Sequence, residues 1–361
     1  MVRLSRVEMQ EHNRAKVLAA ARDEFTERGF RDAKIDQIAD RADLTRGAVY
    51  SNFPSKRALY FTVLAMAAQQ AAEQAPGPEY RPTATTARAA LADFARAWLT
   101  RLPLATEDHH NPTRLDRDLL PEIMADERIS QPFAQLTSLS AILLALCLEQ
   151  FHPPGRRMVR VAEIALTTLH GASQLAAAAP GFGEPFTVVH ACERIAAFDL
   201  GDTWRPAHLP HVTPARPTNQ PWTPPAMTDA LRDEPADLDH DGVLAVLGLH
   251  RLSAIEEAVR AAPPTGAVTL AVVTSNPGEL GPLARLTITE LRGRIRAAIP
   301  KAARPRLRIV HDESGVLATA AGVSAISDAT ESAVRIQAGR VIARADGYGA
   351  CHAAATAPKP G

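Results

Sequence analysis

The stretch from residue 35 to residue 59 limits what this chain can fold into more than any other. It holds two short amphipathic patterns, IDQIADRA and TRGAVYSN, with Asp43-Leu44 between them. Apolar residues recur at helical spacing in the first pattern, and Thr45 can cap the second. Two short helices joined by a tight turn are typical of a helix-turn-helix, whose second helix enters the major groove of DNA. We therefore expect this stretch to bind DNA.

The same stretch resembles the DNA-binding end of the tetracycline-repressor (TetR) family. The resemblance rests on Gly29-Phe30, Ile35, Ile38-Ala39, Ala42, Leu44-Thr45, Gly47, Val49-Tyr50, Phe53, Lys56 and Leu59. It implies a mostly α-helical chain, with a helix-turn-helix head over residues 1–54 and an all-helical ligand-binding and dimerisation body over residues 55–200. It also implies a regulator without enzymatic activity.

Two positions depart from the usual pattern of that family. Lys34 stands where a Ser or Thr normally caps the first helix of the pair, and Asp43 stands where the turn normally has Gly. Because Asp tolerates a left-handed backbone better than most residues, we expect the turn to survive. Asp32 is the candidate substitute cap for the first helix.

The resemblance and the residue types together predict the contacts to DNA. Arg46 suits a bidentate contact to guanine, although a simple surface cation is the alternative. Small side chains at Gly47 and Ala48 allow the helix to approach base edges, and polar side chains near them can reach phosphate oxygens. For Tyr50, a partly buried position in the core is the alternative. The predicted contact residues are Lys34, Thr45, Arg46, Gly47, Ala48, Tyr50, Ser51, Asn52 and Lys56.

Charge and cysteine content narrow the remaining classes of protein. Lys and Arg number 40, as do Asp and Glu, so any attraction to DNA must come from a local patch. That patch is predicted at Arg41, Arg46, Lys56 and Arg57, opposed only by Asp43. The three cysteines lie far apart with no CxxC spacing, which indicates a reducing cytoplasm and neither disulfides nor a zinc site.

No cofactor, metal or membrane span is expected. Asp108, His109 and His110 form a polar loop, and adjacent residues without a spaced partner are an unfavourable set of metal ligands. The first residues have no apolar signal-peptide core, and we find no run of about twenty apolar residues.

Helical patterns fill the body. They span residues 14–29, 55–74, 85–101, 115–127, 132–151, 156–179 and 186–200. The resemblance implies that the last two pair with their copies in a homodimer as a four-helix bundle.

A small apolar ligand is the expected occupant of the body. Its candidate lining residues are Phe94, Trp98, Met124, Phe133, Leu139, Leu143, His170 and Gln174. Ordinary helical core is the alternative for each residue taken singly. His170 and Gln174 are four residues apart and share a helix face. They could orient a polar group of a ligand, or form hydrogen bonds across the dimer interface.

The composition changes after residue 200. Residues 201–238 are rich in proline, which makes helix or sheet implausible and predicts an extended linker. Trp204 and Trp222 within it can dock on a neighbouring surface. Residues 239–350 predict an α/β domain: strands at 243–249, 268–273 and 307–310, helices at 253–262, 283–299 and 315–321, and a hairpin over 332–345. Residues 351–361 are expected to be a flexible tail that carries Cys351.

The α/β part resembles a thioredoxin-like domain. The resemblance rests on its order of elements and on the phrases DESGVLATAAGV and ESAVRIQAGRVIARADGYG. Where that family has its redox CxxC, this chain has His250-Arg251-Leu252-Ser253, and Thr330 replaces the cis-proline. Because disulfide exchange needs a thiolate, we expect a domain that binds or packs rather than one that reacts.

Two classes of function follow. The first is a homodimeric transcriptional regulator, foremost a repressor, that binds a palindromic operator and is released by the ligand. The alternative is a multidomain sensor or interaction protein whose C-terminal domain binds a partner or small molecule. A third possibility is that this domain only extends the dimer interface.

Overall fold

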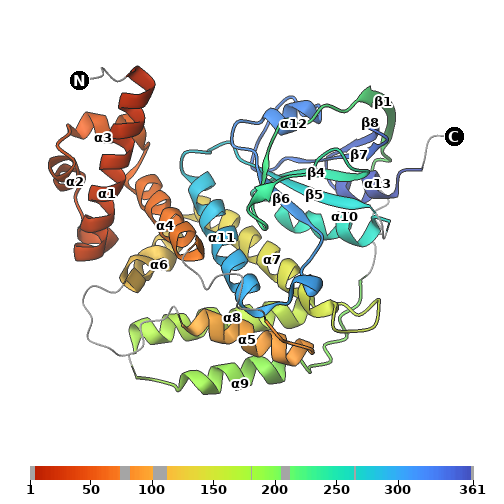
Figure 1. Ribbon diagram of the computed structural model, residues 1–361, viewed down its shortest axis with the longest axis horizontal. Coiled ribbons are helices and arrows are strands. Elements are labelled where there is room, and N and C mark those ends of the chain that lie inside the picture. Colours follow the sequence, from red (N-terminus) through yellow and green to blue (C-terminus); the bar gives the residue numbers. More distant parts are fainter. Residues whose placement is uncertain are drawn as a thin grey trace.

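Three regions follow one another along the chain in the computed structural model, which describes residues 5–73, 82–100, 112–179, 181–204, 212–263 and 266–358. The head contains α1 (Arg6–Asp32), α2 (Ile35–Arg41) and α3 (Arg46–Asn52). The body contains α4 (Lys56–Glu73), α5 (Ala87–Leu99), the 3-10 turn η1 (Pro112–Asp118), α6 (Leu119–Met124), α7 (Glu127–Glu149), α8 (Val159–Ala178) and α9 (Pro185–Ile195). An α/β domain follows (Figure 1). The predicted breaks at residues 76–78 and the polar loop with His109 and His110 lie outside the described residues.

Helix α1 starts earlier than its apolar pattern predicts. The side chain of Ser5 accepts a hydrogen bond from the Glu8 amide at 3.2 Å, and the Glu8 carboxylate accepts one from the Ser5 amide at 2.7 Å. This capping box satisfies two amides at the start of the helix. Gly29 has φ = 76° and interrupts the helix at its predicted end. The Phe30 amide that follows donates to Asp118 of η1 at 2.6 Å, which ties the head to the body.

The turn between α2 and α3 forms as expected, but the cap of α2 does not. Asp43 has φ = 55°, which confirms its left-handed conformation. The prediction that Asp32 caps α2 is wrong, because Asp32 still belongs to the last turn of α1. Lys34 occupies the N-cap position, and within the described residues its side chain makes no capping hydrogen bond.

Helix α7 is the apolar centre of the body. It starts at Glu127, five residues before the predicted start, because Asp126 caps it by accepting from the Arg128 amide at 3.0 Å and Pro132 is tolerated inside the helix. An 18-residue window of α7 reaches a mean hydropathy of 1.5, so by length and composition this helix could cross a membrane, contrary to our expectation from the sequence. Two thirds of that window is buried inside the protein, as in the core helix of a soluble fold.

A mixed six-stranded sheet forms the α/β domain. Its order is β1-β8-β7-β4-β5-β6, with β4 (Gly242–Gly248), β5 (Ala267–Val273) and β6 (Arg308–His311) parallel and β7 (Glu331–Gln337), β8 (Arg340–Asp346) and β1 (Arg216–Pro221) antiparallel. Between them lie η2 (Leu252–Ala254), α10 (Ile255–Ala261), α11 (Leu280–Ala298), η3 (Lys301–Ala303) and α12 (Val316–Ala320). The predicted order of strands and helices is confirmed.

The proline-rich residues 201–238 contribute strands, so the prediction that they form no sheet is wrong. Strand β1 pairs with β8, and the short strands β2 (Thr228–Asp229) and β3 (Glu234–Pro235) pair with each other. Proline is compatible with β1 because β1 is an edge strand with one hydrogen-bonded neighbour. Trp222 docks as expected: its side chain is buried, and its indole N–H donates to the Leu238 carbonyl at 2.8 Å.

The end of the chain is also more ordered than predicted. Residues Ala350–Thr356 form α13, which packs on β7, β8 and α10, and Cys351 is fully buried there. The expected flexible tail is therefore wrong for these residues. Small alanine side chains let α13 lie close against the sheet, and Gly349 starts it with φ = 81°.

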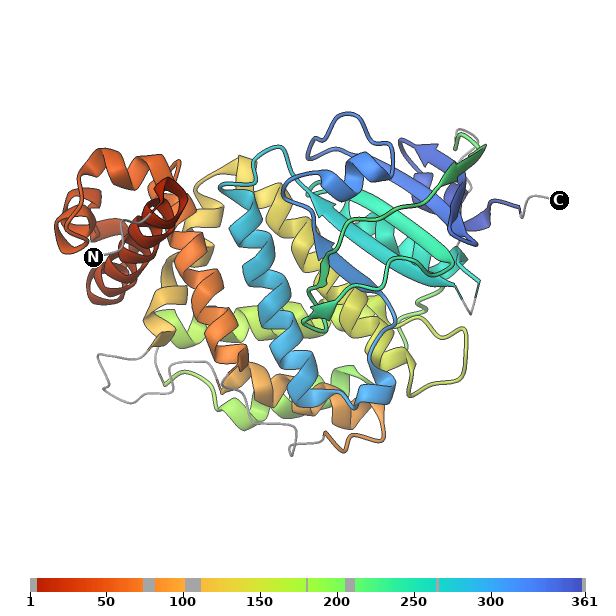
Figure 2. The ribbon, with the colours of Figure 1, turned by 45° about the horizontal axis from the view of Figure 1, so that its top comes forward.

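Helix α11 joins the α/β domain to the body. It runs beside α4 and α7 in both views (Figures 1 and 2), and its contact with α4 is the most extensive between any two elements of the described chain. It also packs on α5, so a single apolar core continues from the body into the sheet. Arg260 of α10 adds an ion pair to Glu149 of α7 at 2.6 Å. The α/β domain is thus part of the core and not a detached module.

Removing the α/β domain should therefore destabilise the body. A chain that ends at residue 204 would expose the apolar sides of α4, α5 and α7 that α11 covers. We expect it to aggregate or to lose its cooperative thermal unfolding transition, because burial of such surface stabilises by about 25 cal/mol per Å². A chain that ends at residue 358 is the control. A truncated chain as soluble and as stable as the control would contradict this account.

Candidate nucleic-acid interface

Helix α3 presents one face outward because its other face is anchored in the core of the head. Val49 is 1% exposed and Phe53 is 2% exposed. Thr45 caps the helix as predicted, accepting from the Ala48 amide at 3.2 Å. The same spacing that buries Val49 and Phe53 turns Arg46 and Tyr50, one helical turn apart, toward solvent.

Arg46 and Tyr50 form the centre of this outward face. The Arg46 side chain is 61% exposed, and its guanidinium carbon lies 5.6 Å from the centre of the Tyr50 ring. A carboxylate oxygen of Asp36, at the start of α2, is 3.3 Å from the same guanidinium. An exposed pair of this kind contributes little to stability, so Arg46 can exchange Asp36 for a base edge or a phosphate at little cost.

Three other predicted contact residues are engaged within the head. The Ser51 hydroxyl and the Asn52 amide nitrogen both donate to the Ala48 carbonyl, at 2.9 and 2.8 Å. The Lys56 ammonium donates to the Arg31 carbonyl at 3.2 Å and lies 4.6 Å from the centre of the Phe30 ring. Burial lowers the pKa of Lys56. A phosphate contact by these side chains would require their present hydrogen bonds to open.

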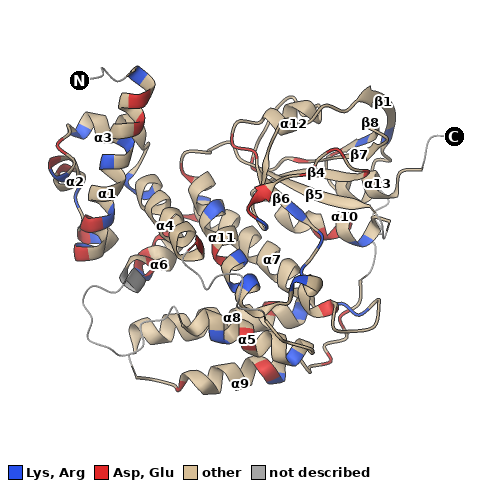
Figure 3. Ribbon diagram, viewed as in Figure 1, with Lys and Arg blue, Asp and Glu red and all other residues tan. Residues whose placement is uncertain are grey.

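The predicted basic patch is also largely paired. Arg41 forms ion pairs with Glu24 and Glu27 of α1, and Arg57 pairs with Asp126 at 2.8 Å. Figure 3 shows acidic and basic residues interspersed on α1 and α2. The sequence could not show this, because the acidic partners come from outside the predicted patch. Of the cations predicted to touch DNA, Lys34 and Arg46 remain exposed.

Arg14 is a supporting residue that sequence reasoning missed. Its guanidinium donates to the Asn52 carbonyl at 3.1 Å and lies 4.4 Å from the centre of the Phe53 ring. It therefore holds the end of α3 against α1. Its position within the pattern of α1 gave no sign of this role, because its partners are about forty residues away in the sequence.

Comparison with known proteins now identifies the head. Residues 17–63 match the family described as bacterial regulatory proteins, tetR family. The head is a DNA-binding domain of the TetR family. Over 55 residues the chain is 40% identical to the HTH-type transcriptional activator FasR of Mycolicibacterium smegmatis and 44% identical to the HTH-type transcriptional regulator SrpR of Pseudomonas putida. Each match covers 15% of this chain, and the two matches cover 25% and 26% of the relatives, so the likeness concerns a short stretch of each protein.

Solved structures of regulators match beyond the TetR head. The repressor NalD of Pseudomonas aeruginosa is 21% identical, with 52% of this chain and 95% of NalD covered at a TM-score of 0.34. A transcriptional regulator of Rhodococcus sp. RHA1 is 22% identical, with 51% and 94% covered at a TM-score of 0.31.

The predicted ligand-lining residues divide into two groups. Phe94, Trp98, Leu139 and Leu143 are buried, and His170 packs edge-on against Trp98 with ring centres 4.8 Å apart and faces Phe133 at 6.4 Å. Met124 does not join them, because its side chain is 83% exposed at the end of α6. Gln174 is exposed beside Leu175, so it does not share the interior surroundings of His170.

Helix α11 places a charged side chain, Arg294, against this aromatic cluster. The Arg294 guanidinium carbon lies 3.8 Å from the centre of the Trp98 ring, and Arg294 is paired with Glu290 at 3.2 Å. The Trp98 indole N–H donates to Ser173 at 2.8 Å. Burial, followed by the positive charge of Arg294, lowers the pKa of His170 to about 4. Sequence reasoning could not place Arg294 here, because it lies in α11, far along the sequence from the end of the body.

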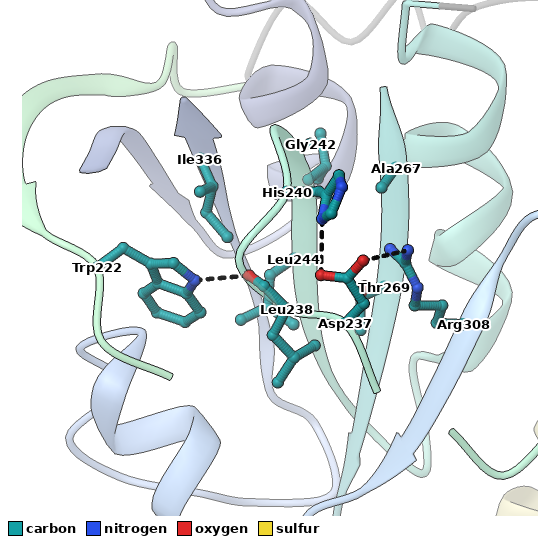
Figure 4. A pocket seen from close by; sticks show the side chains of 11 residues that line it. Trp222, Asp237, Leu238, His240, Gly242, Leu244, Ala267, Thr269, Arg308 and Ile336 are labelled. Carbon is teal, nitrogen blue, oxygen red and sulfur yellow. Dashed lines mark hydrogen bonds and ion pairs between the residues drawn. The ribbon is translucent and has the colours of Figure 1, made fainter. Parts of the chain in front are cut away.

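A small hollow lies in the α/β domain (Figure 4). Trp222, Leu244 and Ile336 line its apolar part. Its charged groups are paired with each other: Asp237 bonds to His240 at 2.6 Å and lies 3.7 Å from Arg308. None of the predicted site residues contributes to it.

The position expected for redox cysteines carries an ion pair instead. Arg251 donates to the carboxylate of Glu331 at 2.8 Å and stacks 4.8 Å from the Tyr348 ring. Cys351 is buried nearby, and burial raises the pKa of its thiol well above the usual value. The described part of the chain holds no cluster of His, Cys, Asp or Glu suited to a metal ion.

His170 should make the stability of the protein sensitive to acid. Its pKa is about 4 when folded and near 6.5 when unfolded, so the unfolded chain binds more protons between these values. Stability should therefore fall as the pH drops from about 6.5 to about 4. We expect His170→Phe, which keeps the ring contacts, to reduce this fall by about 1–3 kcal/mol. Denaturant unfolding across pH measures it.

The exposed His12 gives a matched control for that measurement. His12→Phe removes a histidine from the surface of α1 and leaves the body intact. An equal pH dependence in His170→Phe and His12→Phe would contradict the role of burial at His170.

Proposed function

We propose that this protein is a DNA-binding regulator of transcription that reads its operator with α3. The observation that carries the proposal is the outward pair Arg46 and Tyr50 on a capped helix, within a head that matches the TetR family. Arg46 would contact a guanine edge, Tyr50 a phosphate, and Gly47 and Ala48 would let the helix approach the bases. Lys34 adds a phosphate contact at the start of α2.

A homodimer would present two such helices to a palindrome. Support comes from exposed apolar side chains on α8, on α9 and in the turn between them: Ile164, Leu175, Phe182 and Phe186 are 37%, 47%, 67% and 68% exposed. Ile164, Gly171 and Leu175 recur along one side of α8, and a Cβ added at Gly171 would meet nothing within 4 Å. An exposed apolar surface with room for close approach is typical of an interface between copies.

The body would then respond to a small apolar ligand. The cluster of Phe94, Trp98, Phe133 and His170 offers aromatic walls with one polar group, the composition expected of such a site. Ligand binding would release the operator, and the protein would act as a repressor in the cytoplasm. FasR is described as an activator, so the sign of regulation is the part of this proposal that a promoter–reporter assay must decide.

The direct test is selection of bound fragments from genomic DNA by the full-length protein. We expect enrichment of a palindromic site. Arg46→Ala should weaken binding to that site by roughly ten- to a hundredfold, the loss of one bidentate base contact, and Tyr50→Ala should weaken it further. Arg306→Ala, an exposed arginine of the α/β domain, is the matched control. Absence of any enriched site, or equal binding by Arg46→Ala and Arg306→Ala, would refute the proposal.

A thioredoxin-like domain that binds instead of reacting is the second candidate function for residues 239–350. The order β8-β7-β4-β5 and the antiparallel β7–β8 hairpin favour that relation, and Arg251 with Glu331 fills the place of the reactive thiols. The full-length protein should show no insulin reduction above buffer. Reduction at a rate comparable to a dithiol reductase would refute the binding role.

A further inference from the structure

We propose that α11 and the loop before it fix the orientation of the DNA-binding head by clamping α4 at both ends. The α/β domain would thereby decide the spacing at which two α3 helices meet DNA. This inference rests on the proposed DNA-binding function, and it assigns positioning roles to Glu279 and Gln69.

The first clamp lies where α4 leaves the head. The Ser55 hydroxyl, which also caps α4 by accepting from the Ala58 amide at 2.9 Å, is 3.4 Å from a carboxylate oxygen of Glu279. The same oxygen lies 3.5 Å from the guanidinium of Arg57. The loop fits closely here, since a Cβ added at Gly278 would lie 3.2 Å from the ring of Pro54. Two residues separate this contact from the end of α3.

The second clamp lies near the other end of α4. Arg292 of α11, 4% exposed, donates to the side-chain oxygen of Gln69 at 2.6 Å. Asp233, from the segment between β2 and β3, lies 3.1 Å from Arg292 and also accepts from the Gln69 amide at 3.4 Å. The α/β domain therefore holds α4 through polar contacts at positions 55–57 and again at position 69.

Between the clamps, the first two turns of α4 are enclosed on every side, and the helix reaches solvent at Met66. Every residue from Ala58 to Ala65 is buried, and α4 packs on α1 on one flank and on α11 along its length (Figure 2). A helix whose whole circumference is buried cannot tilt unless a neighbour moves with it, because interiors are close-packed. For α4, the neighbour with the largest contact belongs to the α/β domain.

The consequence concerns DNA geometry. Half-sites one helical turn apart are separated by about 34–36 Å, so each added base pair shifts a half-site by about 3.4 Å and rotates it by about a tenth of a turn. A head on a freely tilting α4 would accept several spacings, whereas a clamped head selects one. Any partner or ligand of the α/β domain that moves α11 would then change operator choice.

The test cuts both clamps without touching the apolar core. Glu279→Ala removes the contacts to both Ser55 and Arg57, and Arg57 keeps its pair with Asp126. Gln69→Ala removes the contact to Arg292, which keeps Asp233. The single and double variants are compared with Asp346→Asn, which weakens an ion pair to Arg216 inside the α/β domain, remote from α4.

The first measurement follows the head within one chain. Spin labels at Glu11→Cys and Arg306→Cys, both exposed positions, report the distance from the head to the α/β domain; the three native cysteines are buried. Labelled chains are diluted with unlabelled ones so that distances within a chain dominate. We expect a narrow distribution in the wild type and in Asp346→Asn, and a broader one in the double variant. An unchanged distribution would overturn the clamp.

The second measurement uses the duplex enriched by the wild-type protein, with half-site spacing changed by one and two base pairs. We expect the double variant to bind the original spacing about tenfold more weakly and to discriminate less between spacings, whereas Asp346→Asn behaves as the wild type. Unaltered spacing preference, or tighter binding at the original spacing, would overturn the proposal. If the wild type enriches no DNA, the proposed function fails, and the distance measurement still judges the clamp.

Discussion

The packing of α11 along α4 is the contact on which the rest of this structure depends. It joins two regions separated by about two hundred residues into one core, and it encloses the helix that carries the head. The polar contacts of Glu279 and Gln69 add direction to that packing, because hydrogen bonds and ion pairs fix the register of two apolar surfaces that could otherwise slide. The same helix brings Arg294 to Trp98. Helix α11 therefore contacts both the interior of the body and the helix that carries the head, while belonging to the α/β domain.

The head itself is held by short-range chemistry. Gly29 interrupts α1 with a positive φ, Asp43 turns the chain, and Thr45 caps α3. Each of these depends on the residue's own backbone preference or on a partner a few positions away, so the sequence alone was sufficient to predict them. The buried face of α3 then leaves Arg46 and Tyr50 outward, and this geometry gives the TetR head a surface suited to DNA.

Long-range pairing is what the sequence could not reveal. Lys56 and Arg57 carry the positive charge expected of phosphate contacts, yet Lys56 packs on Phe30 and Arg57 pairs with Asp126. The period of α11 was visible, but a helix pattern does not say which surface it covers. Strand β1 was missed because its prolines argued against a sheet. Its prolines are compatible with a strand only because β1 lies at the edge of the sheet, and the sequence does not show that position. Met124 failed as a lining residue for the same reason, since apolar character does not fix burial.

A structure of the full-length protein bound to its selected duplex tests the central claim most directly. This account predicts α3 in the major groove, with Arg46 released from Asp36 onto a base edge and Tyr50 against the backbone. It also predicts that α11 keeps its contact with α4 in both copies. A complex in which α3 faces away from the DNA, or in which the head binds with α11 detached from α4, would contradict it.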